Sequence, residues 1–528
     1  MRKGDLKGAA GYAEAAVAQG VAHPLVLRVA AENRIAGGAF AEAGGLLNRA
    51  LAMAPGDVDC LAALGLLLDR EGRPQEAASV YQQALGLDGA HGGAWLGLAR
   101  VLDQLEQDEP AAISYQRAVA AAPRDAAPLA GLADLHLRAG RADAARAAAD
   151  AALKLDAMHA LANCVRGRID LSEGRADEAR RRMEAQLVRN RLAPVERLLA
   201  LNLLGDALDR LDKPVEAIGA YRKMNELIVQ QHAARFGPGG VVESHLDFIS
   251  RLQAGYLTQA DAWRTAPAVV SAAPVARHIF VLGYPRSGNT LAAAVLGAVA
   301  GAQVLEERPT LFDADLALLR DAEGMRRLAE LDLSEAERLR ALYWERVRAD
   351  APQIDGRDMG GKVFIDMSPL NSLKLPVIYK LFPEATIVVC RRDPRDVVFS
   401  CFRQNFRVNA ATYQMTSIEG TARHFAAVMQ LLDASLPLVG ARVHELVYED
   451  FVADFPAGAR ALLEAAGLDW TDEALAFSQA ARKRRLRTAS ADQVRSGLFN
   501  GEGSWRRYAT WLADVQPIVA PWIAPEAP

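Results

Sequence analysis

Apolar and small residues in the first 230 positions recur with helical spacing, and the whole pattern repeats every 34 residues. One series is Ala9, Ala43, Ala77, Ala111, Ala145 and Ala179, and a second is Ala16, Ala50, Ala84, Ala118 and Ala152. Glycines keep the same step at Gly4, Gly38, Gly72, Gly140 and Gly174, with Glu106 in the missing place. Each unit is therefore predicted to be two helices joined by a turn, for example Cys60–Arg70 and Pro74–Leu87. Such units bury their apolar faces only by stacking.

The repeat pattern is irregular at both ends of the array. Near Pro194–Leu227 a sixth unit is shifted by four residues, because Ala217 lies 38 residues after Ala179. Gly4, Ala9 and Ala16 correspond to the second half of a unit. We expect either a single capping helix there or a natural start further upstream.

A different pattern begins after residue 276. Short runs rich in β-branched residues predict strands at His278–Leu282, Lys362–Ile365, Thr386–Cys390 and Val443–Val447. Helical stretches separate them, which favours an α/β fold with a largely parallel sheet. The chain is thus predicted to be multidomain, with an all-α repeat array over 1–235, a loop-rich linker over 236–276 and an α/β domain over 277–528.

The composition of the chain disfavours nucleic-acid binding, a metal site and a membrane span. The chain has 528 residues, with 61 Lys and Arg against 65 Asp and Glu, so no global positive charge indicates nucleic acid. Its four cysteines are scattered without metal-ligand spacing, which predicts reduced thiols and no metal site. No signal peptide and no apolar stretch of about 20 residues is present, which predicts no membrane span and a cytoplasmic location.

The strongest chemical motif is the stretch Gly283–Leu291, G-Y-P-R-S-G-N-T-L, between a predicted strand and a predicted helix. A glycine turn from strand into helix presents backbone N–H groups to an anion. The spacing is that of a P-loop, but Asn289 stands where a nucleotide triphosphatase has lysine. With Arg286 inside the loop instead, a metal-dependent kinase or ATPase is disfavoured and stays an alternative.

A second strand–turn–helix motif runs from Ile387 to Ser400. Arg392 stands at the predicted strand end, and Ser400 lies about two turns into the following helix. The two side chains could therefore converge on one phosphate group.

Together these motifs resemble the sulfotransferase superfamily, whose donor is 3′-phosphoadenosine 5′-phosphosulfate (PAPS). The resemblance covers about residues 277–515 and continues through Tyr448-Glu449-Asp450, Thr488–Arg495 and Trp505–Tyr508. With the repeats in front, the chain is similar to bacterial-type tetratricopeptide-repeat sulfotransferases, whose catalytic part is similar to tyrosylprotein sulfotransferases. The resemblance implies a tetratricopeptide superhelix followed by a P-loop-like α/β sulfotransferase domain.

The resemblance also implies roles for individual residues. The 5′-phosphosulfate would be held by Arg286, Ser287, Gly288, Asn289 and Thr290. The 3′-phosphate would be held by Arg392 and Ser400, with Arg495 as a weaker candidate nearby, and Tyr448 would flank the nucleotide. Glu307, in the segment Val304–Pro309, matches the catalytic base of the tyrosylprotein enzymes, with Glu306 as the fallback.

One position departs from the family pattern. The family commonly has lysine two residues before the proline of a D-K-x-P segment, and here the stretch Asp366–Pro369 has Met367 in that place. Methionine carries no charge and donates no proton. Either Lys374 or Arg286 is predicted to substitute, or activity is reduced.

Three questions stay open from the sequence. The repeats are predicted to bind a protein or peptide through a concave groove, but a spacer or dimerisation surface is an alternative. A repeat scaffold with an inactive transferase half is a second alternative. The basic run 482–487 fits either an anionic site or a solvated helix face.

Overall fold

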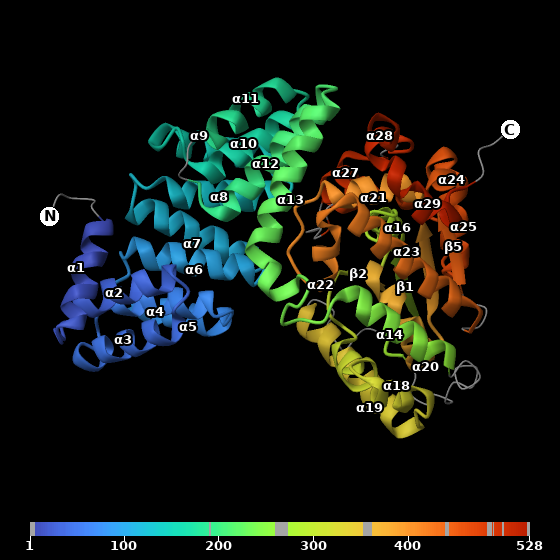
Figure 1. The fold of residues 1–528 in the computed structure, drawn as a ribbon, viewed down its shortest axis with the longest axis horizontal. Coiled ribbons are helices and arrows are strands. Elements are labelled where there is room, and N and C mark those ends of the chain that lie inside the picture. Colours follow the sequence, from blue (N-terminus) through green and yellow to red (C-terminus); the bar gives the residue numbers. More distant parts are fainter. Residues whose placement is uncertain are drawn as a thin grey trace. The chain divides into compact units, whose positions relative to one another are not determined.

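The computed structural model describes residues 6–188, 192–258, 273–351, 362–438, 443–482, 488, 490–498 and 501–524. The chain divides into two compact units, Met1–Glu196 and Arg197–Pro528. Figure 1 shows helices throughout the first unit and a sheet with helices in the second. No helix in these ranges is long and apolar enough to cross a membrane.

The first unit is built from helix pairs with a constant step. First helices begin at residues 24, 58, 92, 126 and 160, and second helices at 40, 74, 108, 142 and 176, so each step is 34 residues. α1 begins at Leu6, where the second helix of a preceding unit would start. The helices are α1 (Leu6–Ala18), α2 (Pro24–Ala36), α3 (Phe40–Met53), α4 (Val58–Arg70), α5 (Pro74–Leu87), α6 (Gly92–Gln104), α7 (Asp108–Ala121), α8 (Ala126–Arg138), α9 (Ala142–Leu155), α10 (Ala160–Ser172) and α11 (Ala176–Leu187).

Local chemistry explains both ends of these helices. Each first helix begins after a side chain that accepts a hydrogen bond from a backbone N–H of its first turn, and these caps are His23, Asp57, His91, Asp125 and His159. The turn between paired helices needs a positive φ, which glycine adopts without strain. Gly38, Gly72, Gly140 and Gly174 have φ between 74° and 79°, and Glu106 takes the same place with φ 62°.

The alanine series pack the array. All the described alanines of the two series from Ala43 to Ala179 have no exposed surface. Small side chains at these positions let neighbouring helices approach closely. The predicted repeat array and its period are therefore confirmed.

The sixth helix pair belongs to the second unit. α12 (Pro194–Arg210) has 17 residues where the other first helices have 13, and this extra turn accounts for the shift of four residues. Leu208 of α12 and Tyr221 of α13 (Pro214–Phe236) share one hydrophobic core with the α/β domain. The division at Glu196 therefore lies about forty residues before the boundary predicted at 235.

The predicted linker 236–276 also differs from the structure. It contains α14 (His245–Thr258), whose Ile249, Leu252 and Tyr256 are buried in the same core. The glycines and prolines that flank this helix gave the segment its loop-like sequence. Residues 259–272 of the predicted linker lie outside the described residues.

The second unit has a five-stranded sheet in the order β2-β3-β1-β4-β5, with every pairing parallel. Its strands are β1 (Arg277–Gly283), β2 (Ala302–Glu306), β3 (Val363–Met367), β4 (Thr386–Arg391) and β5 (Val443–Val447). The four predicted strands are confirmed. β2 was not predicted, because its sequence AQVLE has neither a β-branched run nor clear alternation.

Helices cover both faces of the sheet. Ile279 and Val281 of β1 pack with α16 (Asn289–Leu296) and α25 (Phe455–Ala465) on one face. Phe280 and Leu282 lie in the core on the other face, as the period of two along a strand requires. The remaining α-helices are α17 (Phe312–Ala314), α18 (Ala322–Ala329), α19 (Leu333–Asp350), α20 (Leu375–Leu381), α21 (Pro394–Phe402), α22 (Ala410–Tyr413), α23 (Ile418–Ser435), α24 (Tyr448–Ala453), α26 (Phe477–Arg482), α27 (Ala491–Ser496), α28 (Ala509–Leu512) and α29 (Gln516–Val519).

The strand order places the two chemical motifs together. The chain runs from β1 to one side of the sheet and returns to place β4 on the other side, so a topological switch point lies between β1 and β4. Open α/β sheets bind ligands beyond the carboxyl ends of strands at such a point. Gly283 pairs with Cys390 at these ends, so both predicted motifs begin side by side.

Asp209 of α12 ties the sixth helix pair to the α/β domain. Its carboxylate accepts hydrogen bonds from Arg403 at 3.0 Å and Tyr508 at 2.7 Å and forms an ion pair with Arg507 at 3.0 Å. We expect Asp209→Ala to lower the free energy of unfolding by about 2–3 kcal/mol, because the buried hydrogen bonds to the Asp209 carboxylate are lost, although Arg403 keeps its ion pair with Asp206. Chemical denaturation measures this, with Glu216→Ala on the exposed face of α13 as the control. An equal loss in both variants would contradict the assignment.

Candidate active site

The loop between β1 and α16 has the backbone of an anion-binding turn. Gly283 and Gly288 have φ of 149° and 99°, and Arg286 has φ 70°. α16 starts directly after Gly288, so its free N–H groups open onto the loop. The predicted phosphate loop therefore has the local form that the motif requires.

The carbonyl groups of this loop are held away from a potential anion. Four consecutive carbonyls each accept a hydrogen bond from a side chain outside residues 283–286. The donors are Ser372 to Gly283 (3.0 Å), Asn289 to Tyr284 (2.8 Å), Cys401 to Pro285 (3.4 Å) and Arg392 to Arg286 (3.3 Å). With its acceptors occupied, the loop can turn N–H groups toward a ligand.

This arrangement explains the unusual Asn289. Its side chain is 3% exposed and its amide nitrogen donates to the Tyr284 carbonyl. In this structure the Asn289 side chain stabilises the loop from within. Its predicted contact with a phosphosulfate group stays a prediction.

Arg286, Arg392 and Ser400 lie together, although they come from two motifs more than 100 residues apart. Arg286 Nε donates to Ser400 Oγ at 2.9 Å. Arg392 donates to the Arg286 carbonyl and, at 2.7 Å, to the Gly501 carbonyl. Arg286 therefore contacts Ser400 through its side chain and Arg392 through its carbonyl, while the convergence of Arg392 and Ser400 on one phosphate stays a prediction.

The charges in this cluster are poorly compensated. Burial lowers the pKa of Arg286 to about 10, and the neighbouring Arg392 and Arg403 also disfavour its charge, while Cys401 and Asp206 act in the opposite direction. Arg392 is 3.7 Å from Asp396, and among the described residues its buried Nε has no hydrogen-bond partner. A bound anion would offset this repulsion and satisfy that donor.

Tyr448 closes the cluster from the end of β5. Its ring centre lies 4.6 Å from the Arg392 guanidinium, a cation–π contact. A Cβ atom added to Gly288 would lie 2.8 Å from Tyr448 Cδ2, so the loop backbone packs directly on the ring. Tyr448 is 5% exposed, and its predicted place beside a nucleotide stays a prediction.

We expect Gly288→Ala to weaken binding of an anionic ligand at this loop at least about 10-fold. The substitution adds both φ strain and a clash with Tyr448. Gly301→Ala is the matched control, because Gly301 has φ 78° but nothing within 4 Å of the added Cβ. Thermal unfolding with and without 3′-phosphoadenosine 5′-phosphate (PAP) measures the stability of each variant and its stabilisation by the ligand. Equal ligand-induced stabilisation in the two variants would contradict this role of Gly288.

The remaining predicted donor residues lie near a C-terminal segment. Ser287 and Thr290 are buried, and Thr290 is hydrogen-bonded to Thr488 at 3.0 Å. Arg286 also donates to Ser490 and to Gln493. Arg495 is 8% exposed and its carbonyl accepts a hydrogen bond from Arg482.

Sequence reasoning noted the segment 488–495 without assigning roles to Thr488, Ser490 or Gln493. The signal that could have identified these three residues is that their segment belongs to the sulfotransferase resemblance. The basic residues 483–487 lie outside the described residues.

Glu307 and Glu306 at the end of β2 differ in environment. Glu306 is 6% exposed, whereas the Glu307 side chain is open to solvent. Glu307 N–H donates to the Met367 carbonyl at 2.7 Å, and its φ is 50°. Of the two carboxylates, only Glu307 is therefore accessible to a second substrate.

The electrostatics of Glu307 suit proton transfer. Surrounding protein raises the pKa of Glu307 to about 7, the Glu306 charge adds to the increase, and Arg286 opposes it. The solvent contact of the carboxylate stabilises its charged form and works against the increase. A carboxylate with a pKa near neutrality can accept a proton efficiently.

Asp366 anchors the segment that carries Glu307. It is fully buried and accepts hydrogen bonds from Thr310 at 2.7 Å and Tyr343 at 2.8 Å. Burial raises its pKa to about 6, although both hydrogen bonds favour the charged form. This anchor has no signal in the sequence beyond the family segment that contains Asp366, because Thr310 and Tyr343 are distant in sequence.

Met367, which stands where the family has lysine, and Lys374, its predicted substitute, have different environments. Met367 has no exposed surface and lies in the core beside α16. The Lys374 ammonium is 2.5 Å from the Asp315 carboxylate. Lys374 therefore has a carboxylate partner, and its substitution for the family lysine stays a prediction.

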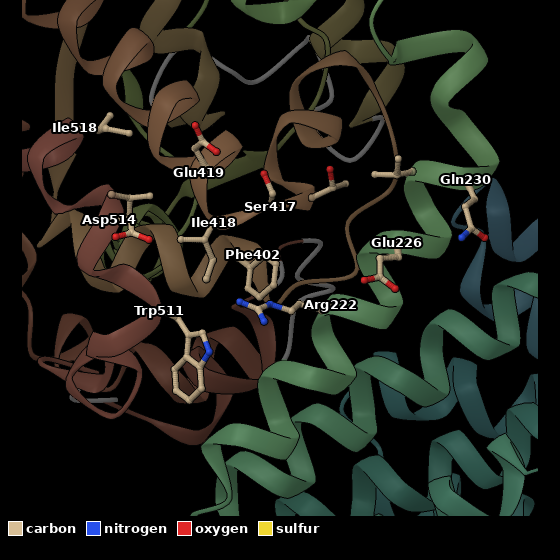
Figure 2. Close-up of a pocket in the computed structure, with 13 residues that line it drawn as sticks. Arg222, Glu226, Gln230, Phe402, Ser417, Ile418, Glu419, Trp511, Asp514 and Ile518 are labelled. Carbon is tan, nitrogen blue, oxygen red and sulfur yellow. The ribbon is translucent and has the colours of Figure 1, made fainter.

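A separate pocket of about 680 Å³ lies between α13, α23 and the C-terminal helices (Figure 2). Apolar side chains such as Phe402 and Trp511 line it together with Arg222, Glu226 and Asp514. None of the predicted donor residues lines it, and its charged groups include more carboxylates than cations. We therefore do not assign an anionic donor to it.

Among the described residues, no group of three or more His, Cys, Asp or Glu side chains could hold a metal ion. The four cysteines are buried free thiols.

Comparison with known proteins identifies the families of both parts of the chain. Residues 278–472 match the family model described as Sulfotransferase family. The chain carries a sulfotransferase family domain. Residues 70–113, 130–181 and 164–226 match models described as Tetratricopeptide repeat. The predicted combination of tetratricopeptide repeats and a sulfotransferase domain is therefore confirmed, and its particular likeness to tyrosylprotein enzymes stays a prediction.

Individual relatives are distant. An uncharacterized protein of Aquifex aeolicus (strain VF5) is 28% identical over 262 residues, which cover 47% of this chain and 32% of that protein. Among solved structures, the chain is similar to PilF of Pseudomonas aeruginosa, with 18% identity over 38% of this chain and 91% of that one and a TM-score of 0.32. The chain is also similar to a thermophilic tetratricopeptide-repeat protein of Thermus thermophilus, with 22% identity over 34% of this chain and 98% of that one and a TM-score of 0.29.

Proposed function

We propose that the chain transfers a sulfuryl group from PAPS to a hydroxyl or amine of an acceptor. The observation that carries this proposal is the cluster of Arg286, Arg392 and Ser400 beside a phosphate loop at the switch point of the sheet. The Arg392 guanidinium and the Ser400 hydroxyl suit the 3′-phosphate, while the loop N–H groups and Arg286 suit the 5′-phosphosulfate.

The donor supplies a sulfuryl group on a good leaving group, the 5′-phosphate of PAP. On this proposal Ser287, Gly288 and Thr290 hold the phosphosulfate end through the loop and the start of α16. Arg392 and Ser400 hold the other phosphate. The Arg286 charge lowers the pKa of Glu307, and Arg286 is proposed to neutralise charge that develops between the two ends.

Glu307 is the proposed general base. It takes the proton of the acceptor hydroxyl as the oxygen–sulfur bond forms and the sulfur–phosphate oxygen bond breaks. The pair of electrons of the broken bond leaves on the PAP phosphate. Positioning and electrostatic stabilisation supply most of the rate in transfers of this loose type.

The acceptor is proposed to be a protein or peptide bound by the repeats. Stacked repeats form extended concave surfaces that commonly bind polypeptides. Glycan or metabolite hydroxyls remain chemically equivalent acceptors for Glu307. Because the repeats are proposed to bind the acceptor, an experiment that identifies the acceptor needs the full chain.

The proposal is tested by incubating the full chain with radiolabelled PAPS in excess EDTA. Acceptors are peptides with tyrosine, serine or threonine and simple phenols. Label on an acceptor with matching release of PAP is the expected result. Absence of transfer together with magnesium-dependent ATP hydrolysis would favour the nucleotide triphosphatase alternative.

An inactive scaffold is the second candidate function. Met367 favours it, because the core position that it fills offers no cation to the leaving oxygen. PAP binding without transfer to any acceptor would support this reading.

A further inference from the structure

Two buried polar side chains and a partly buried one extend from the donor loop to the start of α14. Tyr284, inside the loop, has no exposed surface, and its hydroxyl lies 2.8 Å from His424 Nδ1 on α23. His424 is also fully buried, and its Nε2 lies 2.7 Å from His245 Nδ1 at the start of α14. The proposed transfer uses none of these groups.

One arrangement of protons satisfies both contacts. Among the described residues, His424 is the one hydrogen-bond partner of the Tyr284 hydroxyl, and we assign Tyr284 as the donor to Nδ1 of His424 because this arrangement satisfies the hydroxyl proton. His424 then carries its proton on Nε2 and donates to Nδ1 of His245. His245 in turn carries its proton on Nε2. This order requires both imidazoles to be neutral.

The surroundings keep both imidazoles neutral. Burial lowers the pKa of His245 to about 4, with Lys374 acting in the same direction and Glu243 opposing it. Burial also holds the pKa of His424 well below its usual value. The order of protons is therefore stable at neutral pH.

We infer that His424 and His245 are positioning residues that fix Tyr284, and through it the donor loop. The inference rests on the proposed function. The Tyr284 carbonyl is already held by Asn289 and by Ser287 N–H, so the hydroxyl contact fixes the opposite end of the same residue. Arg286, two residues after Tyr284, has a positive φ and belongs to the cluster with Arg392 and Ser400.

The first test is Tyr284→Phe, which removes one hydroxyl and leaves the packed ring in place. PAP affinity is expected to fall about 3- to 10-fold by calorimetry, since one buried hydrogen bond is lost. Tyr256→Phe is the matched control. It removes a buried hydroxyl from α14, where Tyr256 donates to the Leu373 carbonyl, without touching the loop. Its PAP affinity is expected to stay within about 2-fold of the wild type.

The second readout separates positioning from packing. Selective ¹⁵N labelling of histidine is expected to show His424 and His245 as neutral Nε2-protonated tautomers at pH 7, with the His424 Nδ1 signal shifted in Tyr284→Phe. A His424 protonated on Nδ1 would overturn the inference. So would Tyr284→Phe with unchanged affinity, or Tyr256→Phe with an equal loss. If the wild type does not bind PAP, the proposed function fails and the inference falls with it.

Discussion

Glu307→Gln is expected to lower the rate of sulfuryl transfer to a hydroxyl acceptor by about 10²- to 10⁴-fold, the usual contribution of a general base. Glutamine preserves the size of the side chain but cannot accept the acceptor proton. Glu307 is the accessible carboxylate of the pair at the end of β2, whereas Glu306 is buried. PAP affinity should stay within about 2-fold of the wild type, because Glu307 is not placed among the anion-binding groups.

The control for Glu307 is a reaction that needs no proton transfer. In the reverse direction, p-nitrophenyl sulfate and PAP give PAPS and p-nitrophenolate, which leaves without protonation. Glu307→Gln should therefore slow this reaction far less than transfer to an alkyl hydroxyl. Equal losses in both assays would mean that Glu307 shapes the site rather than moving a proton.

The same group sets the expected pH dependence. The base acts in its charged form, and the raised pKa places the change near pH 7. Below that pH, kcat/KM should fall about 10-fold per pH unit, and above it the profile should be level. In Glu307→Gln, kcat/KM should not show this fall at low pH.

Arg392→Ala is expected to weaken PAP binding by about 10- to 100-fold, the effect of losing charge-assisted hydrogen bonds to a phosphate. Arg392 contacts the Tyr448 ring and the Arg286 carbonyl, and its buried Nε has no hydrogen-bond partner among the described residues. Calorimetry with PAP in EDTA measures the change.

Arg391→Ala is the matched control for Arg392. Arg391 is adjacent in sequence, but it pairs with Asp433 and Glu445 rather than with the loop. It should alter stability slightly and PAP affinity by less than about 2-fold. Similar losses in the two variants would indicate a general effect of charge instead of a phosphate contact.

Periodic features were predictable from the sequence, because they depend on local chemistry. The 34-residue step predicted the helix pairs of the first unit, although α4 begins at Val58 and not at the predicted Cys60, and turn glycines marked positive φ positions. The four β-branched runs gave four of the five strands. The convergence of Arg392 and Ser400, inferred from their interval across a strand end and the following helix, stays a prediction.

Features that depend on tertiary contacts were not predictable. α12 and α13 resemble one more repeat, yet Tyr221 and Leu208 pack in the core of the α/β domain. The partners that hold the loop carbonyls, such as Ser372 and Cys401, lie about 90 to 115 residues away and form no motif. The ion pair between Lys374 and Asp315 has no local signal either.

The central claim, a site for a nucleotide with a 3′-phosphate, is tested most directly by calorimetry of the full chain in EDTA with PAP and, separately, with AMP. We predict micromolar or tighter binding of PAP and at least about 100-fold weaker binding of AMP, because AMP lacks the phosphate that Arg392 and Ser400 would hold. Equal affinity for the two nucleotides, or binding only of ATP with magnesium, would contradict the account.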